Sequence, residues 1–219
     1  MRPLLPRRQS RSAGSLHEVD SVPALRPISA SIFSTWRRPA VPSIGMPELI
    51  SPNTQLRDSW LAARDEWGRE THQDGAGLNV GDDVDTAAGF AAWVERLRLQ
   101  SDPSTLLEES RVYANYWWIV DNDEYLGAIC LRGTLNNFLL RAGGNIGYGI
   151  RPSARRRGLA KWALRAVLPE ARALGLGRVL VVCEDANIAS ARTIESNGGV
   201  LEDVPLTELG RTRRYWIAL

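Results

Sequence analysis

The chain has 219 residues, of which 44% are hydrophobic, and a formal net charge of +2. This size and composition suit one globular domain with a full apolar core. No apolar run approaches the ~20 residues needed to cross a bilayer, so we expect a cytoplasmic protein without a membrane segment.

The first 45 residues differ in composition from the rest of the chain. They contain seven arginines against two acidic residues, are rich in serine and proline, and show no helical or strand periodicity. Such a segment cannot bury enough apolar area to offset the entropy lost on ordering. We therefore predict a disordered tail over 1–45 and a folded domain over 46–219. Met46 is the only methionine after the first residue, and we hypothesise that the natural protein begins there.

The first part of this domain is predicted to contain one strand and two helices. These elements are a strand at 46–50 and helices at 54–70 and 86–100. In both helices the apolar residues recur at helical spacing. Asn53 or Thr54 is a suitable cap for the first helix, and Asp85 or Thr86 for the second, because their side chains accept hydrogen bonds from free backbone amides.

From residue 115 onward the sequence alternates between strands and helices. The predicted strands are 115–120, 125–133, 145–151, 178–184 and 213–219, and the predicted helices are 158–175 and 187–199. The acidic stretch 121–124 favours a hairpin between the first two strands. Pro169 lies inside the long helix and is expected to kink it or to force an irregular turn. This order of elements predicts one α/β domain with a mixed sheet.

Cysteine and histidine usage argues against a metal site. Cys130 and Cys183 each lie in an apolar strand, where buried reduced thiols are expected, and the chain has only two histidines. No zinc-ligand spacing is present, and we predict no bound metal.

The stretch "RPSARRRGLA" at 151–160 carries three consecutive arginines directly before Gly158. Such a run is typical of a nucleic-acid contact, a solvated charged surface, or an anion site. Here it follows a strand and opens a helix, whose first turn has unpaired amides and the positive end of the helix dipole. Gly158 has no Cβ, so a ligand can approach the backbone closely. The spacing is neither that of a Walker loop nor that of a dinucleotide-binding turn. We expect a pyrophosphate here.

These residues also carry a resemblance to a family. Arg155-x-x-Gly158-x-Ala160 resembles the Gln/Arg-x-x-Gly-x-Gly/Ala motif of the GNAT-type N-acetyltransferases. The segments "NIGYGIRPS", "NIAS" and "ESNGG" are similar to the family's splayed strand, its cofactor-proximal Asn and its helix exit. The resemblance covers roughly residues 48–219. Within the family, the sequence looks like a bacterial subgroup of uncharacterised predicted acetyltransferases. It implies an α/β fold with a central mixed, mostly antiparallel twisted sheet, flanked by helices, in which two central strands splay apart.

The resemblance implies acetyl-CoA as the acetyl donor. The residues that it places at the cofactor are Ile150, Arg151, Arg155, Arg156, Arg157, Gly158, Leu159, Ala160, Asn187 and Ser190. The backbone amides of residues 155–160 would hold the pyrophosphate, with the arginine side chains near the phosphates. The strand that ends at residues 150 and 151 would pair with the pantetheine arm, and a backbone amide near Gly149 or Ile150 would stabilise the developing oxyanion.

Acetyl transfer to an amine requires a neutral amine, and Glu184 is our candidate general base because it ends an apolar strand where the central strands should part. The alternative is an acidic loop residue that caps the next segment. The family's usual general acid is a tyrosine seven residues after the cofactor Asn, where this chain has Ile194. Tyr148, Tyr215 or water takes that role, or no acid is needed.

The acceptor is expected to be a small-molecule or peptide amine bound by the first two helices, the loop 70–85 and the segment 134–144. Acidic residues in that loop favour a cationic acceptor. The main hypothesis is an acetyl-CoA-dependent N-acetyltransferase that acts by direct attack, as a monomer or homodimer. Two alternatives stay open: an acyl-CoA-binding sensor without turnover, and a nucleic-acid binder that uses the arginine-rich tail. Because the domain beyond residue 45 carries more acidic than basic residues, we expect no nucleic-acid partner.

Overall fold

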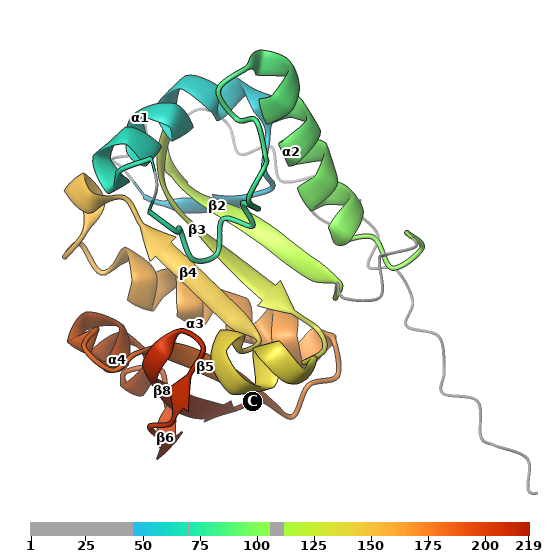
Figure 1. The fold of residues 1–219 in the computed structure, drawn as a ribbon. Helices are drawn as coiled ribbons and strands as arrows, with labels where there is room; N and C mark the ends of the chain where they lie inside the picture. Colours follow the sequence, from blue (N-terminus) through green and yellow to red (C-terminus); the bar gives the residue numbers. More distant parts are fainter. Residues whose placement is uncertain (1–45, 70, 106–111) are drawn as a thin grey trace, which may run out of the picture.

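The computed structural model describes residues 46–69, 71–105 and 112–219. They form one eight-stranded sheet in the order β1-β2-β3-β4-β5-β8-β6, with β7 paired to β8 (Figure 1). Among the described strands, β4 and β5 are paired in parallel and the other pairs are antiparallel. The predicted tail over 1–45 lies outside the described residues.

The strands and helices have the following bounds. The strands are β1 Glu48–Ile50, β2 Ala114–Asp121, β3 Glu124–Arg132, β4 Ile146–Ile150, β5 Arg178–Glu184, β6 Val200–Asp203, β7 Leu206–Thr207 and β8 Gly210–Ala218. The α-helices are α1 Arg57–Trp67, α2 Ala87–Gln100, α3 Leu159–Ala173 and α4 Ile188–Glu195. Three short helical segments complete the list: η2 Thr54–Leu56, the π-helix η3 Leu139–Gly143, and η4 Pro152–Ala154.

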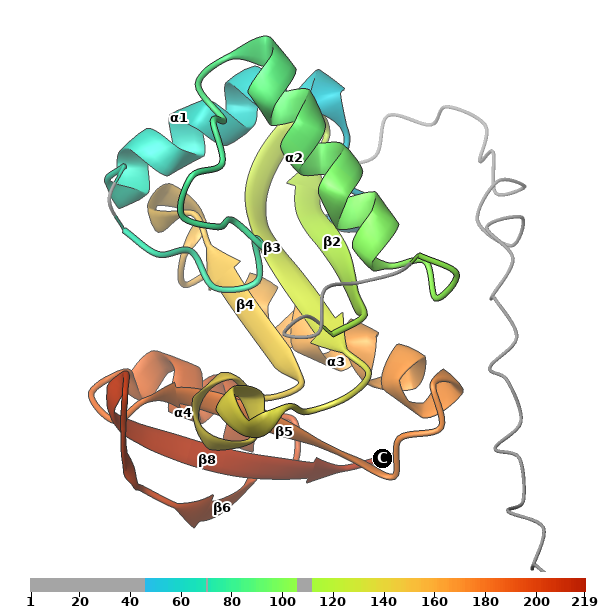
Figure 2. The same ribbon diagram turned by 45° about the vertical axis from the view of Figure 1, so that its right-hand side comes forward.

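Helices cover both faces of the sheet and create two apolar cores. Figure 2 shows α1 and α2 on one face and α3 on the other. The core under α3 and α4 is mainly aliphatic, with Tyr215 fully buried in it, whereas the core under α1 and α2 is built around five buried aromatic rings. These rings are Trp60, Phe90, Trp93, Trp118 and Tyr125, all at most 1% exposed. Within the described residues no helix is long and apolar enough to span a membrane.

Most predicted elements are confirmed, with small shifts at their ends. The first predicted helix begins as η2, where Asn53 accepts a hydrogen bond from the amide of Gln55. Thr86 caps α2 by accepting a bond from the amide of Gly89. Helix α3 continues through Pro169 to Ala173 without the expected irregular turn. The strands β6 and β7 and the π-helix η3 were not predicted.

Candidate functional site

The central feature of the site is the wedge, which we define as the region where β4 and β5 separate beyond their single paired position, Ile146 opposite Val181. Asn145 holds the closed end of the wedge. Its amide donates to the carbonyl of Leu180 at 2.7 Å, and its Oδ1 accepts from the amide of Leu180 at 2.8 Å. Its Nδ2 also donates to the carbonyl of Arg132 on β3 at 2.9 Å. One buried side chain thus ties three strands together where the opening begins.

The backbone groups of β4 that face the wedge follow from its pairing with β3. The amide of Arg151 donates to Leu126, and the amide of Arg132 donates to the carbonyl of Asn145. Since hydrogen-bonded and non-hydrogen-bonded positions alternate in an antiparallel pair, the backbone of Gly147 and Gly149 also faces β3. The even-numbered residues of β4, Tyr148 and Ile150, therefore turn their amides and carbonyls toward the wedge.

The turn from β4 into α3 ends in a run of unpaired backbone amides. Within the described residues, the amides of residues 156–161 donate to no acceptor, as expected for the first turn of a helix. Gly158 precedes α3 with φ +80°, and a Cβ added there would meet nothing within 4 Å. The backbone of Arg156 is also in the left-handed region, with φ +62°. No acidic residue lies in this turn or in the first turn of α3. The arrangement suits a pyrophosphate, because the donors are free and the approach is open.

The arginines of this turn differ in what they already contact. The amide of Arg155 donates to Pro152 at 3.3 Å, and its Nε donates to the carbonyl of Ile150 at 3.1 Å. Arg157 lies 3.5 Å from a carboxylate oxygen of Asp121. The exposed side chain of Arg156 forms no ion pair within the described residues. Arg156 is thus the guanidinium most available to a phosphate.

Arg151 anchors the turn to the rest of the fold. Its side chain, 12% exposed, donates to Glu66 on α1 at 2.7 Å and to Glu124 on β3 at 2.9 Å. Its backbone amide donates a hydrogen bond to the carbonyl of Leu126, and its carbonyl accepts one from the amide of Ala154. The hydrogen bond from Arg151 lowers the pKa of Glu66 to about 2. All the polar groups of Arg151 are therefore engaged by the protein itself.

The start of α4 closes the other side of the wedge. Asn187 caps α4: its Oδ1 accepts a hydrogen bond from the amide of Ser190 at 3.0 Å, and its side-chain Nδ2 has no partner within the described residues. The hydroxyls of Tyr148 and Ser190 are 2.8 Å apart and connect β4 to α4. The two residues predicted near the cofactor, Asn187 and Ser190, thus lie together beside the open end of β5.

Burial raises the pKa values of the phenol of Tyr148 and the thiol of Cys183. Cys183 is 8% exposed and belongs to the core under α3 and α4, as predicted for a packed thiol. Ile194, at the position of the missing tyrosine, is fully buried in the same core. The hydroxyl of Tyr215 donates to Glu195 at 2.9 Å. Of the two tyrosines considered as general acids, Tyr148 is the one whose hydroxyl contacts residues at the wedge.

Glu184 lies at the open end of β5 with an exposed side chain. Side chains alternate along a strand, so Glu184 points to the face opposite Cys183, away from α3 and α4. Gly147 and Gly149 of β4 lie on that same face. The carboxylate forms no hydrogen bond or ion pair within the described residues. It is therefore free to act on a molecule that enters the wedge from this face.

The loop between α1 and α2 covers the glycine face of β4. Gly75 has φ +80°, and a Cβ there would lie 2.6 Å from the carbonyl oxygen of Gly147. A Cβ on Gly149 would lie 2.8 Å from the carbonyl oxygen of Asp74. Glycines on both sides thus allow the loop to rest directly on the strand. The carboxylate of Asp74 stays exposed and forms an ion pair with His72 at 3.3 Å, and this contact raises the pKa of the imidazole.

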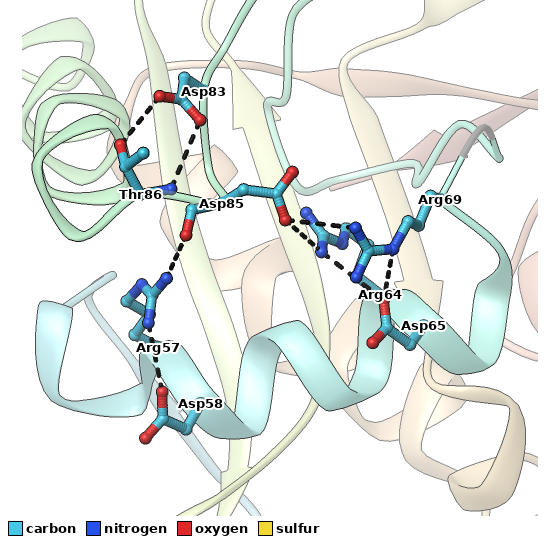
Figure 3. Close-up of polar contacts among 8 residues, drawn as sticks. All are labelled: Arg57, Asp58, Arg64, Asp65, Arg69, Asp83, Asp85 and Thr86. Carbon is cyan, nitrogen blue, oxygen red and sulfur yellow. Dashed lines mark hydrogen bonds and ion pairs between the residues drawn. The ribbon is translucent and has the colours of Figure 1, made fainter.

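A polar network fixes the far end of this loop to α1. Figure 3 shows Asp85 between Arg57, Arg64 and Arg69 of α1 and the segment that follows it. Arg64 is only 4% exposed and donates to Asp85 at 2.8 Å, and this bond lowers the pKa of that carboxyl. Asp83 accepts a hydrogen bond from the hydroxyl of Thr86 at 2.8 Å. The network holds the loop in place over β4.

This network changes what the acidic loop implies about an acceptor. Asp82 binds Arg96, Asp83 binds Thr86, and Asp85 is surrounded by arginines, so three of the four loop carboxylates serve the fold. Asp74, which rests beside β4, is the fourth, and it pairs with His72. The argument from loop charge toward a cationic acceptor is correspondingly weaker.

Sequence reasoning missed Asn145 and the π-helix η3. Asn145 follows two glycines, a composition that indicates a turn, and nothing local marks it as a buried tie between strands. The segment that was assigned to the acceptor site contains η3, whose Arg141 donates to Glu208 at 2.6 Å. That ion pair brings η3 against the connection between β7 and β8.

Comparison with known proteins gives two further findings. A family model described as an acetyltransferase (GNAT) domain matches residues 25–200, a range that begins inside the predicted tail. The comparison with curated protein sequences gave no significant match.

Solved structures show the same fold. A RimL ribosomal L7/L12 alpha-N-protein acetyltransferase with coenzyme A has a TM-score of 0.60 at 17% identity, covering 81% of this chain and 96% of its own. RimJ from Mycobacterium smegmatis, with CoA-disulfide, has a TM-score of 0.60 at 17% identity over 80% and 82% of the two chains. The microcin C7 self-immunity acetyltransferase MccE, with acetyl-CoA and AMP, has a TM-score of 0.58 at 13% identity over 79% and 92%.

Proposed function

The chain belongs to the GNAT acetyltransferase family, and on that premise we propose that it transfers the acetyl group of acetyl-CoA to a primary amine by direct attack. Bound acetyl-CoA would supply an activated thioester carbonyl. RimL and MccE, which share this fold, are complexes with coenzyme A and with acetyl-CoA, respectively. The residues described above would bind the donor, stabilise charge and accept the proton of the amine.

The cofactor site proposed here rests on the turn into α3. The free amides of residues 156–161 would donate to the pyrophosphate, and Arg156 would add a charge-assisted contact. The side chain of Leu159 is 5% exposed and anchors the start of the helix in the core, so its amide is held in position. Ile150 would lie along the pantetheine arm with its carbonyl held by Nε of Arg155, and Arg151 and the amide of Arg155 are likewise engaged. The side-chain Nδ2 of Asn187 and the side chain of Ser190 border the same opening.

The oxyanion donor follows from the register of β4. Because the amide of Gly149 faces β3, we assign the role to the amide of Ile150, with that of Tyr148 as its neighbour on the same edge. A backbone amide held in a sheet needs no reorganisation when negative charge develops on the carbonyl oxygen.

Proton transfer is assigned to Glu184 and to the hydroxyl pair. The free carboxylate of Glu184 would take a proton from the ammonium group, directly or through one water molecule. Since burial raises the pKa of Tyr148, its phenol keeps its proton and suits hydrogen-bond donation to the departing sulfur better than full proton transfer. Its bond to Ser190 orients the hydroxyl.

The observation that carries the proposal is the combination of a wedge between β4 and β5 with free amides at the start of α3. The test is release of free coenzyme A from acetyl-CoA, followed with a thiol reagent across polyamines, aminoglycosides and peptides with free N-termini. Amine-dependent release that the Gly158→Asp variant lacks would support the proposal. Tight binding of acetyl-CoA with no release for any amine would favour a sensor over an enzyme.

A further inference from the structure

Glu184 has a close cross-strand neighbour with an unsatisfied hydroxyl group. In the antiparallel pairing of β5 and β8, Glu184 lies opposite Thr212. The amide of Asp185 donates to the carbonyl of Arg211 at 2.9 Å, so residues 185 and 211 form a hydrogen-bonded pair. The next pair, Glu184 with Thr212, is therefore of the non-hydrogen-bonded kind, in which side chains lie closest together.

The two side chains of this pair point to the same face of the sheet. Directly opposed residues in an antiparallel ladder share a face, and this is the face that carries the glycines of β4. Thr212 is 2% exposed, and the hydrogen bond from its amide to Pro205 at 3.1 Å holds its backbone in place. The side chain of Glu184 is exposed, so packing does not fix its rotamer.

The hydroxyl of Thr212 is buried and has no hydrogen-bond partner among the residues that the structure describes. Leaving a buried hydroxyl unpaired is destabilising, because the group loses its hydrogen bonds to water and gains none in the protein. The neighbouring carboxylate of Glu184 is a strong acceptor that also lacks a partner. The hydroxyl of Thr212 is thus a donor without an acceptor, and the carboxylate of Glu184 is an acceptor without a donor. The two residues lie on adjacent strands at the open end of the wedge.

We propose that Thr212 is a positioning residue that donates its hydroxyl hydrogen to Glu184 and holds the carboxylate over the wedge. The inference rests on the proposed function, since the position of Glu184 matters for the reaction only if Glu184 is the base. With the carboxylate held, one oxygen accepts from Thr212 and the other is directed at the ammonium group.

Other charged groups near this pair are already engaged. On β8, Arg214 shares the face of Thr212 and is bound by Glu202 and Asp203. Asp185, next to Glu184 in the chain, is held by Arg211 and Arg213 on the opposite face. Across the wedge the loop presents the ion pair of His72 and Asp74. Arg132 also lies on this face, beside Gly147, and its Nη1 donates to the carbonyls of Gly143 and Gly144. None of these cations forms an ion pair with Glu184 within the described residues.

The experiment compares Thr212→Val with Thr212→Ser. Valine keeps the shape of threonine and removes an unpaired buried hydroxyl, so the variant should fold, whereas serine keeps the hydroxyl. The first readout is an NMR titration of the side-chain carboxyl carbon of Glu184, assigned with Glu184→Gln, in the full chain with bound coenzyme A. A lost hydrogen bond should raise the titration midpoint by about one pH unit in Thr212→Val, and Thr212→Ser should restore it. An unchanged midpoint in Thr212→Val would overturn the proposal.

The second readout separates this inference from the proposed function. In the coenzyme A release assay, Thr212→Val should move the acid limb of the pH–rate profile by the same amount without changing the affinity for acetyl-CoA. If the titration midpoint moves and the rate does not, the hydrogen bond exists and Glu184 is not the base. If neither moves, Thr212 has no role in positioning Glu184.

Discussion

Gly158→Asp tests the proposed pyrophosphate site most selectively. Gly158 is exposed, has φ +80°, and would place a new Cβ in open space, so no steric conflict arises. Aspartate is among the residues that tolerate the left-handed region, and we expect a stability loss of about 1 kcal/mol. The new carboxylate would lie beside the free amides of residues 156–161, where the pyrophosphate is expected to bind.

The expected loss of affinity follows from electrostatics. Two unit charges about 4 Å apart interact with about 4 kcal/mol at an effective dielectric constant of about 20. Because this turn is exposed, solvent screening reduces that figure, and we expect a loss of about 2–4 kcal/mol, or roughly 30- to 1000-fold in affinity.

Titration calorimetry with acetyl-CoA measures this loss directly, and the chain offers a matched control. Gly175, after the end of α3, also has φ +80° and open space around a Cβ, so Gly175→Asp carries the same backbone strain away from the wedge. Gly158→Asn separates charge from bulk. The reasoning is refuted if Gly158→Asp binds acetyl-CoA within about threefold of the unmodified chain.

Two further predictions concern ionisable groups. Glu184→Gln should slow coenzyme A release most at low pH, where the acceptor depends on a base to lose its proton, and an unchanged pH–rate profile would remove Glu184 from the mechanism. Glu66→Gln should lower the free energy of unfolding at neutral pH, because the pKa of Glu66 in the folded chain is reduced to about 2 from its ordinary value of 4.5 by Arg151. This contribution is present above about pH 4.5 and is lost as the pH falls toward 2, so urea unfolding curves of the two proteins should converge in that window and differ above it.

The turn is predicted from a local pattern, whereas the splayed strands that form the wedge are implied by the resemblance to the GNAT family. The alternation of Gly147 and Gly149 with larger residues indicates a strand with one flat face, and Gly158 after a strand indicates a helix start open to a ligand. The structure agrees on both points, since the loop rests on the two glycines and the amides after Gly158 are free.

The contacts that complete the site join residues distant in the chain and leave no local signal. Arg151 meets Glu66 across 85 positions, and Arg64 meets Asp85 across 21. Without such partners in view, the loop carboxylates resemble an acceptor site, although most of them stabilise the fold. Thr212 likewise cannot be recognised from the local sequence, because only the register of β8 against β5 places it opposite Glu184.

The central claim is that this chain binds acetyl-CoA through the wedge and the turn into α3. Thermal unfolding of the full chain with acetyl-CoA at about 100 times its dissociation constant tests it most directly. The account predicts a stabilisation of about 2.7 kcal/mol and a rise in the midpoint of about 5–10 °C, with a much smaller rise for S-acetyl-pantetheine, which lacks the pyrophosphate. An unchanged midpoint at millimolar acetyl-CoA would contradict it.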